Sequence, residues 1–415
     1  MKRARKLILI ACGIVVLCVV AFWLSASSRS LTALPDDVSI APASSAVTPD
    51  VAAFSGAWLG VWCGGPPTAL IVEEIHSNNT AEVIYSWGNV PDRKLKADWE
   101  RETAPISNGK LKLSSDDEPN IEFSIEPDGT LLGRYELGDD PPAFAELHRI
   151  PTTNVTAILA AAKKPAVFYE ETRVPTHSRV GPTKDKSYGL QTTIYRQASA
   201  GRHPVVIFNH GSTGPGIVPA NMVFRGGNEE TFFHSLGYVV VVPMRKGRGD
   251  SDGPNLEEDN SVSPAVQLDS AIEDLQAVVT YVRQRPDVDT NKIVVAGVSR
   301  GGLLSVAYAG RYPTNVAGVI NFSGGWFGER MPTADFNFES FRNAGHDARV
   351  PMLWLYADRD SFFSLKFDER EFSTFREAGG RGELVEVRDI PGEGHLLFLW
   401  VDRWRDKVTS YLKSF

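Results

Sequence analysis

From about residue 165 onward, the sequence alternates short, almost uninterrupted apolar runs with longer stretches of helical periodicity. Near-continuous apolar strands are typical of a parallel sheet, because helices cover both of its faces. The runs lie at 205–208, 238–242, 293–296, 316–320, 352–356 and 384–387. This alternation predicts a doubly wound, mostly parallel α/β domain over 165–415, with an antiparallel edge pair at about 167–178 and 187–197.

The preceding region, 53–150, has a different period. Short segments that alternate apolar and polar residues are separated by turn signals at 77–79, 107–109 and 127–129. Strands at this spacing predict a small all-β barrel or sandwich. Its opening, Gly56–Trp62, loosely resembles the first strand of lipocalin-like barrels. A ligand-binding barrel and a packing or docking module both remain open, and we favour the packing or docking module.

The N-terminus has the pattern of a targeting segment. Basic residues at 2, 3, 5 and 6 precede an apolar run over 7–24, and no charge follows before Arg29. Residues 1–28 are therefore predicted to be a cleaved signal peptide or a retained membrane anchor. Residues 29–52, rich in Pro, Ser and Ala, then form a flexible linker. Both alternatives export the body of the protein to the periplasm or another extracytoplasmic space, anchored by 7–24 if uncleaved.

Composition excludes several function classes. The net charge is −8, and basic residues form no tract outside the extreme N-terminus, which excludes nucleic acid as a partner. Of the three cysteines, only Cys63 lies outside the apolar N-terminal run, so we expect neither an internal disulfide nor a Cys-based zinc site. Asp250 and Asp252 lack the spacing of a calcium loop. The sequence predicts no metal and no cofactor.

The strongest local motif is Gly-x-Ser-x-Gly at Gly297, Ser299 and Gly301, set between a predicted strand and a predicted helix. A serine on a tight strand-to-helix turn has strained dihedral angles, and the flanking glycines avoid clashes with neighbouring backbone. Such a turn raises the hydroxyl above the sheet and aims the helix N-terminus at a developing oxyanion. The motif predicts Ser299 as a nucleophile. The alternative is a plain strand-to-helix turn that uses glycines for close packing.

A serine hydroxyl needs a base, and the base needs a carboxylate that fixes its tautomer. His395 follows the last predicted strand, whereas His346 follows none, so we predict His395 as the base. Asp358 and Asp360 end the preceding strand. The spacing after Ala357 favours Asp360, and we expect Asp358 to cap the following helix or to pair with Arg359.

Two backbone N–H groups must bind the oxyanion. The first is predicted to be that of Arg300, directly after the nucleophile. The second should come from the loop after strand 205–208, where Gly211 allows close approach and Ser212 follows. His210 could itself be a catalytic histidine. Its position directly after that strand favours a structural role in bracing the loop.

Together, His210-Gly211, the turn from Gly297 to Gly301, Asp360 and His395 resemble the α/β-hydrolase superfamily, in the chain order Ser, Asp, His. The segment 243–253 is similar to a loop of the dienelactone hydrolase-like branch, which acyl-peptide and X-prolyl peptidase relatives share. The resemblance covers about 165–415. It implies hydrolysis by a catalytic triad, although dienelactone hydrolase proper uses cysteine where this chain has Ser299.

The predicted function is hydrolysis of a carboxylic ester through an acyl-enzyme on Ser299. The alternatives are a serine peptidase of the prolyl-oligopeptidase or acyl-peptidase type, a thioesterase, or a non-catalytic scaffold with the same fold. The substrate is expected to be a small-molecule ester or a short peptide. Trp326 and Phe327, with Phe336, Phe338 and Phe341, either line an acyl pocket or simply pack. The sequence predicts no oligomeric state.

Overall fold

The computed structural model describes residues 32–64, 66–88, 96–113, 120–136, 138, 140–162, 169–197, 199–212 and 222–415. The predicted signal peptide or anchor, 1–28, lies outside these residues. Among the described residues, no helix combines the length and the apolar character that crossing a membrane requires. The chain divides into two compact units between residues 167 and 168.

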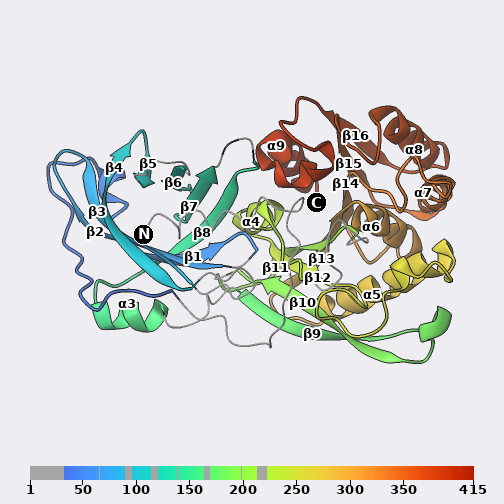
Figure 1. Ribbon diagram of the computed structural model, residues 1–415, viewed down its shortest axis with the longest axis horizontal. Coiled ribbons are helices and arrows are strands. Elements are labelled where there is room, and N and C mark those ends of the chain that lie inside the picture. The colour runs from blue at the N-terminus through green and yellow to red at the C-terminus, as the bar shows by residue number, and fades with distance from the viewer. Residues whose placement is uncertain are drawn as a thin grey trace. The chain divides into compact units, whose positions relative to one another are not determined.

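The first unit is a closed antiparallel β-barrel of eight strands in sequence order (Figure 1). The strands are β1 (Gly56–Trp62), β2 (Pro67–Ile75), β3 (Thr80–Trp87), β4 (Asp98–Ser107), β5 (Lys110–Leu113), β6 (Asn120–Ile125), β7 (Leu131–Glu136) and β8 (Ala143–Ile150). β1 pairs with both β2 and β8, which closes the barrel. At this closure a Cβ on Gly60 would lie 1.9 Å from the carbonyl oxygen of Glu146, so only glycine is accommodated.

Side chains that alternate along these strands form two separate apolar clusters. One includes Trp62, Tyr85 and Phe123 and fills the barrel interior. The other lies on the outer face, where Ile71 and Ile84 pack with helix α3 (Val155–Ala162). The short helix α2 (Pro49–Ala52) precedes β1. The first unit is thus a barrel with a packed aromatic interior.

Cys63, directly after β1, corrects one expectation. The sequence predicts no internal disulfide, but Cys63 is disulfide-bonded.

The second unit is an α/β domain built on an eight-stranded sheet in the order β16-β15-β14-β13-β11-β12-β10-β9. Its strands are β9 (Tyr169–His177), β10 (Ser187–Tyr195), β11 (His203–Asn209), β12 (Val239–Pro243), β13 (Val288–Val298), β14 (Gly318–Phe322), β15 (Met352–Ala357) and β16 (Gly382–Val387). β11 to β16 run parallel, while β9 and β10 form the antiparallel edge pair that the sequence predicts. The sheet is therefore mostly parallel, as the sequence predicts.

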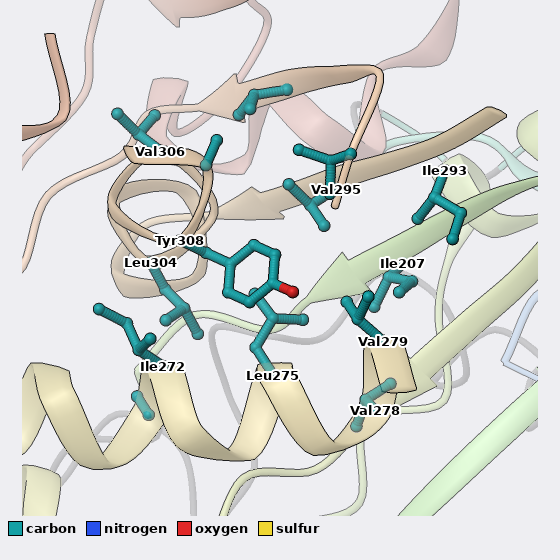
Figure 2. Close-up of a cluster of buried hydrophobic side chains, with 14 of the residues drawn as sticks. Ile207, Ile272, Leu275, Val278, Val279, Ile293, Val295, Leu304, Val306 and Tyr308 are labelled. Atoms are coloured by element: carbon teal, nitrogen blue, oxygen red, sulfur yellow. The ribbon is translucent and has the colours of Figure 1, made fainter. Parts of the chain in front are cut away.

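Helices pack against the sheet because their apolar stripes match its continuous apolar strands. They are α4 (Asn228–Ser235), α5 (Pro264–Arg283), α6 (Arg300–Arg311), α7 (Asp335–Asp347), α8 (Leu365–Glu377) and α9 (Val401–Leu412), with short 3₁₀ turns η3 (Gly181–Thr183), η4 (Leu256–Glu258) and η5 (Gly394–Leu399). Figure 2 shows α5 and α6 packed through Leu275 and Tyr308 against Ile207 and Val295 of the strands. Elsewhere Trp404 of α9 contacts Phe232 of α4 and Phe322 of β14.

Candidate active site at the carboxyl ends of the parallel strands

Ser299 occupies the turn between β13 and α6 with a strained backbone. Its φ is 56° and its ψ is −125°, values that cost a non-glycine residue about 1–3 kcal/mol. A Cβ on Gly297 would lie 2.4 Å from the carbonyl oxygen of Gly301, and a Cβ on Gly301 would lie 2.1 Å from that of Asn209. The two glycines are therefore required for the tight turn that places Ser299 at the N-terminus of α6.

Asp360 lies in the loop after β15, and its carboxylate is fully buried and held by three donors. The amides of Phe362 and Phe363 donate to Oδ1 at 2.8 and 3.1 Å, and Nδ1 of His395 donates to Oδ2 at 2.9 Å. Its side chain is 0% exposed. A carboxylate with these partners has a fixed orientation and can fix that of the imidazole in turn.

His395 begins η5, after β16, and its imidazole is 12% exposed. Because Asp360 accepts from Nδ1, that nitrogen carries a proton in the neutral ring, and Nε2 has the lone pair. A Cβ on Gly394 would lie 2.0 Å from the carbonyl oxygen of Asp358, so glycine lets the histidine loop approach the acid loop. His346, in contrast, is 80% exposed at the end of α7, beside Asp347.

A chain of contacts joins the turn of Ser299 to the ring of His395. The carbonyl oxygen of Ser299 accepts a hydrogen bond from the amide of Gly325 at 3.1 Å. A Cβ on Gly325 would lie 2.4 Å from Cζ of Phe363, whose ring centroid is 5.6 Å from that of His395. β13, β14, β15 and β16 are parallel neighbours, so the loops that carry the three residues leave the same edge of the sheet.

The loop after β11 lies against Ser299. A Cβ on Gly211 would lie 3.2 Å from Cβ of Ser299. The carbonyl oxygen of Gly211 accepts from Nδ1 of His210 at 2.7 Å and from Nη2 of Arg245 at 3.2 Å. In a trans peptide the N–H of the next residue points opposite to the carbonyl. Holding this carbonyl from one side therefore turns the N–H of Ser212 to the other.

His210 is buried and has a bracing position. Nε2 accepts from the amide of Arg245 at 3.3 Å, while Nδ1 donates to Gly211. Burial and the positive charge of Arg245 hold the pKa of His210 well below its ordinary value. The ring is therefore neutral, with both nitrogens in hydrogen bonds within the loop.

A buried ion network lies behind this loop, and the sequence analysis did not find it. Glu257 binds Arg245 through Nε and at 3.1 Å through Nη2, and it binds Arg248 at 3.3 Å. Burial alone would raise the pKa of Glu257, but these guanidinium groups hold it well below its ordinary range. Beside it Lys246 contacts Asp274 at 2.5 Å. The signal available was the run Arg245-Lys246-Gly247-Arg248, whose charges need acidic partners if buried.

Arg300 contributes more than its backbone amide. Its side chain donates to the carbonyl oxygens of Trp326 at 3.1 Å and Glu257 at 3.0 Å, with its guanidinium 5.4 Å from the Trp326 ring centroid and 5.9 Å from that of Phe327. Trp326 is 2% exposed, and its indole donates to Gln267. Trp326 is thus mainly a packing residue, while Phe327 is only partly buried.

Glu393 is a second feature that sequence reasoning missed. One oxygen, Oε1, accepts from the amide of Ser361 at 2.8 Å and from the amide of His395 at 3.2 Å. The carboxylate therefore ties the loop that carries Asp360 to the loop that carries His395. No motif marks such a residue, because its role depends on two segments that meet only in the fold.

The remaining carboxylates near the site have structural partners. The carboxylate of Asp358 accepts from the amides of Asp389 and Ile390, and the residue that caps α8 is Ser364. Capping of this helix, one of the two roles predicted for Asp358, is therefore wrong. Asp252 pairs with Arg173 at 2.9 Å. Within the residues that the structure describes, no group of three His, Cys, Asp or Glu side chains could hold a metal ion.

Comparison with known proteins identifies the domain. Residues 190–395 match the model of the dienelactone hydrolase family. The chain carries a dienelactone hydrolase family domain. This match spans β10 to the start of η5 and contains the residues of the site from Gly211 to His395.

Among solved structures, the chain is similar to the esterase Pf2001 of Pyrococcus furiosus, with 16% identity, 59% of this chain and 90% of that chain covered, and a TM-score of 0.42. For acetyl xylan esterase 1 from Thermoanaerobacterium the values are 16%, 53%, 77% and 0.40. For an acylaminoacyl peptidase they are 13%, 86%, 70% and 0.42. Because these TM-scores are below 0.5, the family assignment depends on the matched residues 190–395 alone.

Proposed function

We propose that the dienelactone hydrolase family domain is a serine hydrolase that cleaves a carboxylic ester. The observation that carries the proposal is the 2.9 Å hydrogen bond from His395 to the buried carboxylate of Asp360, at the strand edge that presents Ser299. A nucleophile on a strained turn, a base with a defined tautomer and an orienting acid are the parts that acyl transfer needs.

In the proposed reaction, Oγ of Ser299 attacks the ester carbonyl carbon while Nε2 of His395 takes the hydroxyl proton. The amides of Ser212 and Arg300 stabilise the negative charge on the carbonyl oxygen. The imidazolium then gives its proton to the alcohol oxygen as the carbon–oxygen bond breaks, which leaves an acyl-enzyme. Water attacks this ester by the same steps and releases the carboxylic acid and free Ser299.

Labelling tests the assignment directly. A fluorophosphonate should modify the wild-type protein at Ser299, as identified by mapping the modified peptide, and should not modify Ser299→Ala. Hydrolysis of p-nitrophenyl acetate should be lost in both Ser299→Ala and His395→Ala, while His346→Ala keeps wild-type turnover. A fully active Ser299→Ala would refute the proposal.

The same protein can be assayed for the alternative substrates. Short acyl esters, alanine or proline aminopeptide substrates and acyl thioesters share the acyl-enzyme intermediate, so Ser299 is needed for each. Comparing kcat/KM across the three classes identifies the substrate class. The ester proposal fails if a peptide or thioester exceeds every ester.

We also propose that the domain acts outside the cytoplasm, as the basic and apolar pattern of residues 2–24 suggests. Fractionation of cells, followed by N-terminal sequencing, tests this proposal. A shortened, extracytoplasmic chain indicates a cleaved signal peptide, and a full-length chain in the membrane fraction indicates a retained anchor. A full-length cytosolic chain would refute export.

A further inference from the structure

Phe362 is a large apolar side chain that remains exposed beside the proposed base. Phe362 is 37% exposed. The centroid of its ring lies 4.6 Å from that of the His395 imidazole, with 42° between the two ring planes. Apolar side chains that stay exposed next to a reactive group are candidates for ligand contact rather than for the core.

The backbone of Phe362 is fixed from both sides. Its amide donates to Asp360 at 2.8 Å, and its carbonyl oxygen accepts from the amide of Glu329 at 3.0 Å. One of these bonds is made to the carboxylate that orients His395, so the backbone from which the ring projects is fixed relative to the imidazole. This fixed backbone limits the ordering cost of a contact made by the ring.

A second exposed apolar residue lies on the adjoining turn. The amide of Met331 donates to the carbonyl oxygen of Gly328 at 3.0 Å, and a Cβ on Gly328 would lie 3.7 Å from Cδ1 of Phe362. Met331 is 51% exposed. The turn that carries Met331 thus adjoins Phe362, which lies on the His395 side of the site, and we call Phe362 and Met331 the apolar rim.

The chemistry of the base identifies which part of a substrate this rim contacts. His395 must reach the oxygen that leaves, because it supplies the proton as the ester carbon–oxygen bond breaks. A group attached to that oxygen therefore lies next to the imidazole. We propose that Phe362, with Met331 on the adjoining turn, binds the alcohol portion of the ester, and that the substrates are esters of aromatic or bulky apolar alcohols. This inference rests on the proposed function.

The balanced reaction is an ester plus water giving a carboxylic acid plus an apolar alcohol. The proton lost by Ser299 is the one that the alcohol gains, and the proton released by the attacking water restores the serine hydroxyl. The rim takes part in the first half only, since the acyl-enzyme no longer contains the alcohol. Its contribution should therefore show in kcat/KM and not in the rate of acyl-enzyme hydrolysis.

Three esters separate the two sides of the carbonyl. Benzyl acetate carries an aromatic ring on the alcohol side, ethyl phenylacetate carries it on the acyl side, and ethyl acetate carries none. For each ester the ratio of wild-type to Phe362→Ala kcat/KM cancels the intrinsic reactivity of that ester. We expect this ratio to be about 5 to 10 for benzyl acetate, the size of one lost aromatic contact, and below about 2 for the other two.

The matched control is Leu236→Ala. Leu236 has a similar exposure of 38%, but it follows α4 and precedes the first residue of β12. It therefore lies near the amino end of that strand, whereas the site lies at the carboxyl ends of the strands. The Leu236→Ala variant should have wild-type kcat/KM on all three esters. Met331→Ala should lower kcat/KM for benzyl acetate alone, by less than Phe362→Ala does. Thermal melts of all variants confirm that they are folded.

Three outcomes would overturn the inference while leaving the proposed function intact. An equal loss on all three esters would mean that Phe362 only supports the Asp360–His395 pair. A loss confined to ethyl phenylacetate would place the rim on the acyl side, and unchanged values would remove the contact altogether. The proposed function itself fails instead if the wild type cleaves no ester in a Ser299-dependent way.

Discussion

Asp360 and His395 are separated by 35 positions in the chain, yet Oδ2 of the aspartate accepts a hydrogen bond of 2.9 Å from Nδ1 of the histidine. The other carboxylate oxygen is occupied by the amides of Phe362 and Phe363. The aspartate cannot rotate without losing these bonds. The imidazole is therefore held in one tautomer, with the lone pair on Nε2.

The first prediction concerns this pair. Asp360→Asn keeps the size of the side chain and one oxygen for the two amides, but it places an NH₂ group opposite Nδ1. The histidine must then adopt the other tautomer, which cannot accept the serine proton. We expect kcat to fall by roughly 10³–10⁴-fold, the loss typical of such a triad, with a folded protein. Esterase kinetics and a thermal melt measure both properties.

Asp347→Asn is the control for this substitution. Asp347 is exposed and pairs with His346, the histidine that we do not propose as the base. Its kcat should equal that of the wild type. If Asp360→Asn retains more than about a tenth of wild-type kcat, Asp360 does not act through His395.

The second prediction concerns Glu393, which joins the loops of Asp360 and His395 through the amides of Ser361 and His395. Glu393→Ala leaves both amides without this acceptor and frees the histidine loop to move. Misplacement of a catalytic group by about 1 Å can cost 10²-fold, so we expect a loss of kcat of at least about tenfold. Glu393→Gln keeps an acceptor oxygen and should restore most of the activity.

The rescue by glutamine distinguishes positioning from charge. If Glu393→Gln is as inactive as Glu393→Ala, the negative charge matters more than the two hydrogen bonds. If neither substitution changes kcat, the loops are held by other contacts, and the role assigned to Glu393 is wrong.

The third prediction contrasts two glycines of the site. A Cβ on Gly211 would lie 3.2 Å from Cβ of Ser299, a tight contact that a small shift can relieve. That shift moves the Ser212 amide, so we expect Gly211→Ala to lower kcat/KM by about tenfold or more in a folded protein, as loss of an oxyanion donor does. A Cβ on Gly301 would lie 2.1 Å from a backbone oxygen, so Gly301→Ala should strongly lower Tm.

Kinetics and thermal melts on the two variants, side by side, test this contrast. A Gly211→Ala enzyme with wild-type kcat/KM would show that the loop after β11 does not supply the oxyanion donor. A stable and active Gly301→Ala would contradict the tight turn at Ser299.

Much of the second unit could be predicted from sequence because its strands are buried on both faces. Runs such as 293–296 and 352–356 contain almost nothing but apolar residues, and the structure places β13 and β15 over them. The antiparallel edge pair was also predicted correctly. In contrast, α7 was missed, and the aromatic residues near it were considered for an acyl pocket. Phe341 is in fact buried, 4.5 Å from the ring centroid of Trp354.

The β-barrel shows why the remaining elements escaped prediction. β4 has the sequence DWERETAPIS, and most of its side chains are exposed or half-buried, so no apolar alternation marks it. Closure by pairing of β1 with β8 is likewise a non-local property. At the site, Ser299, Asp360 and His395 carry local motifs, whereas Arg245 and Glu257 form a buried pair whose purpose depends on the Gly211 carbonyl that Arg245 binds.

The last prediction concerns two acids on the inner side of α8, Asp368 and Glu371, which are 1% and 0% exposed. Burial, followed by the charge of Glu371, raises the pKa of Asp368 to about 10, and burial raises that of Glu371 well above its ordinary value. We therefore expect Asp368 to be neutral at pH 7 in the folded protein, while in the unfolded chain it ionises near pH 4. Between these values the unfolded state binds fewer protons, so stability falls as pH rises.

Asp368→Asn removes one group that binds a proton in the folded state and loses it in the unfolded state. Each such group lowers the free energy of unfolding by up to about 1.4 kcal/mol per pH unit between its unfolded and folded pKa values. The Tm of the wild type should therefore fall more steeply from pH 6 to pH 9 than that of Asp368→Asn. Glu369→Gln, an exposed neighbour on the same helix, should keep the wild-type slope. Parallel curves for the wild type and Asp368→Asn would mean that Asp368 is ionised in the folded protein.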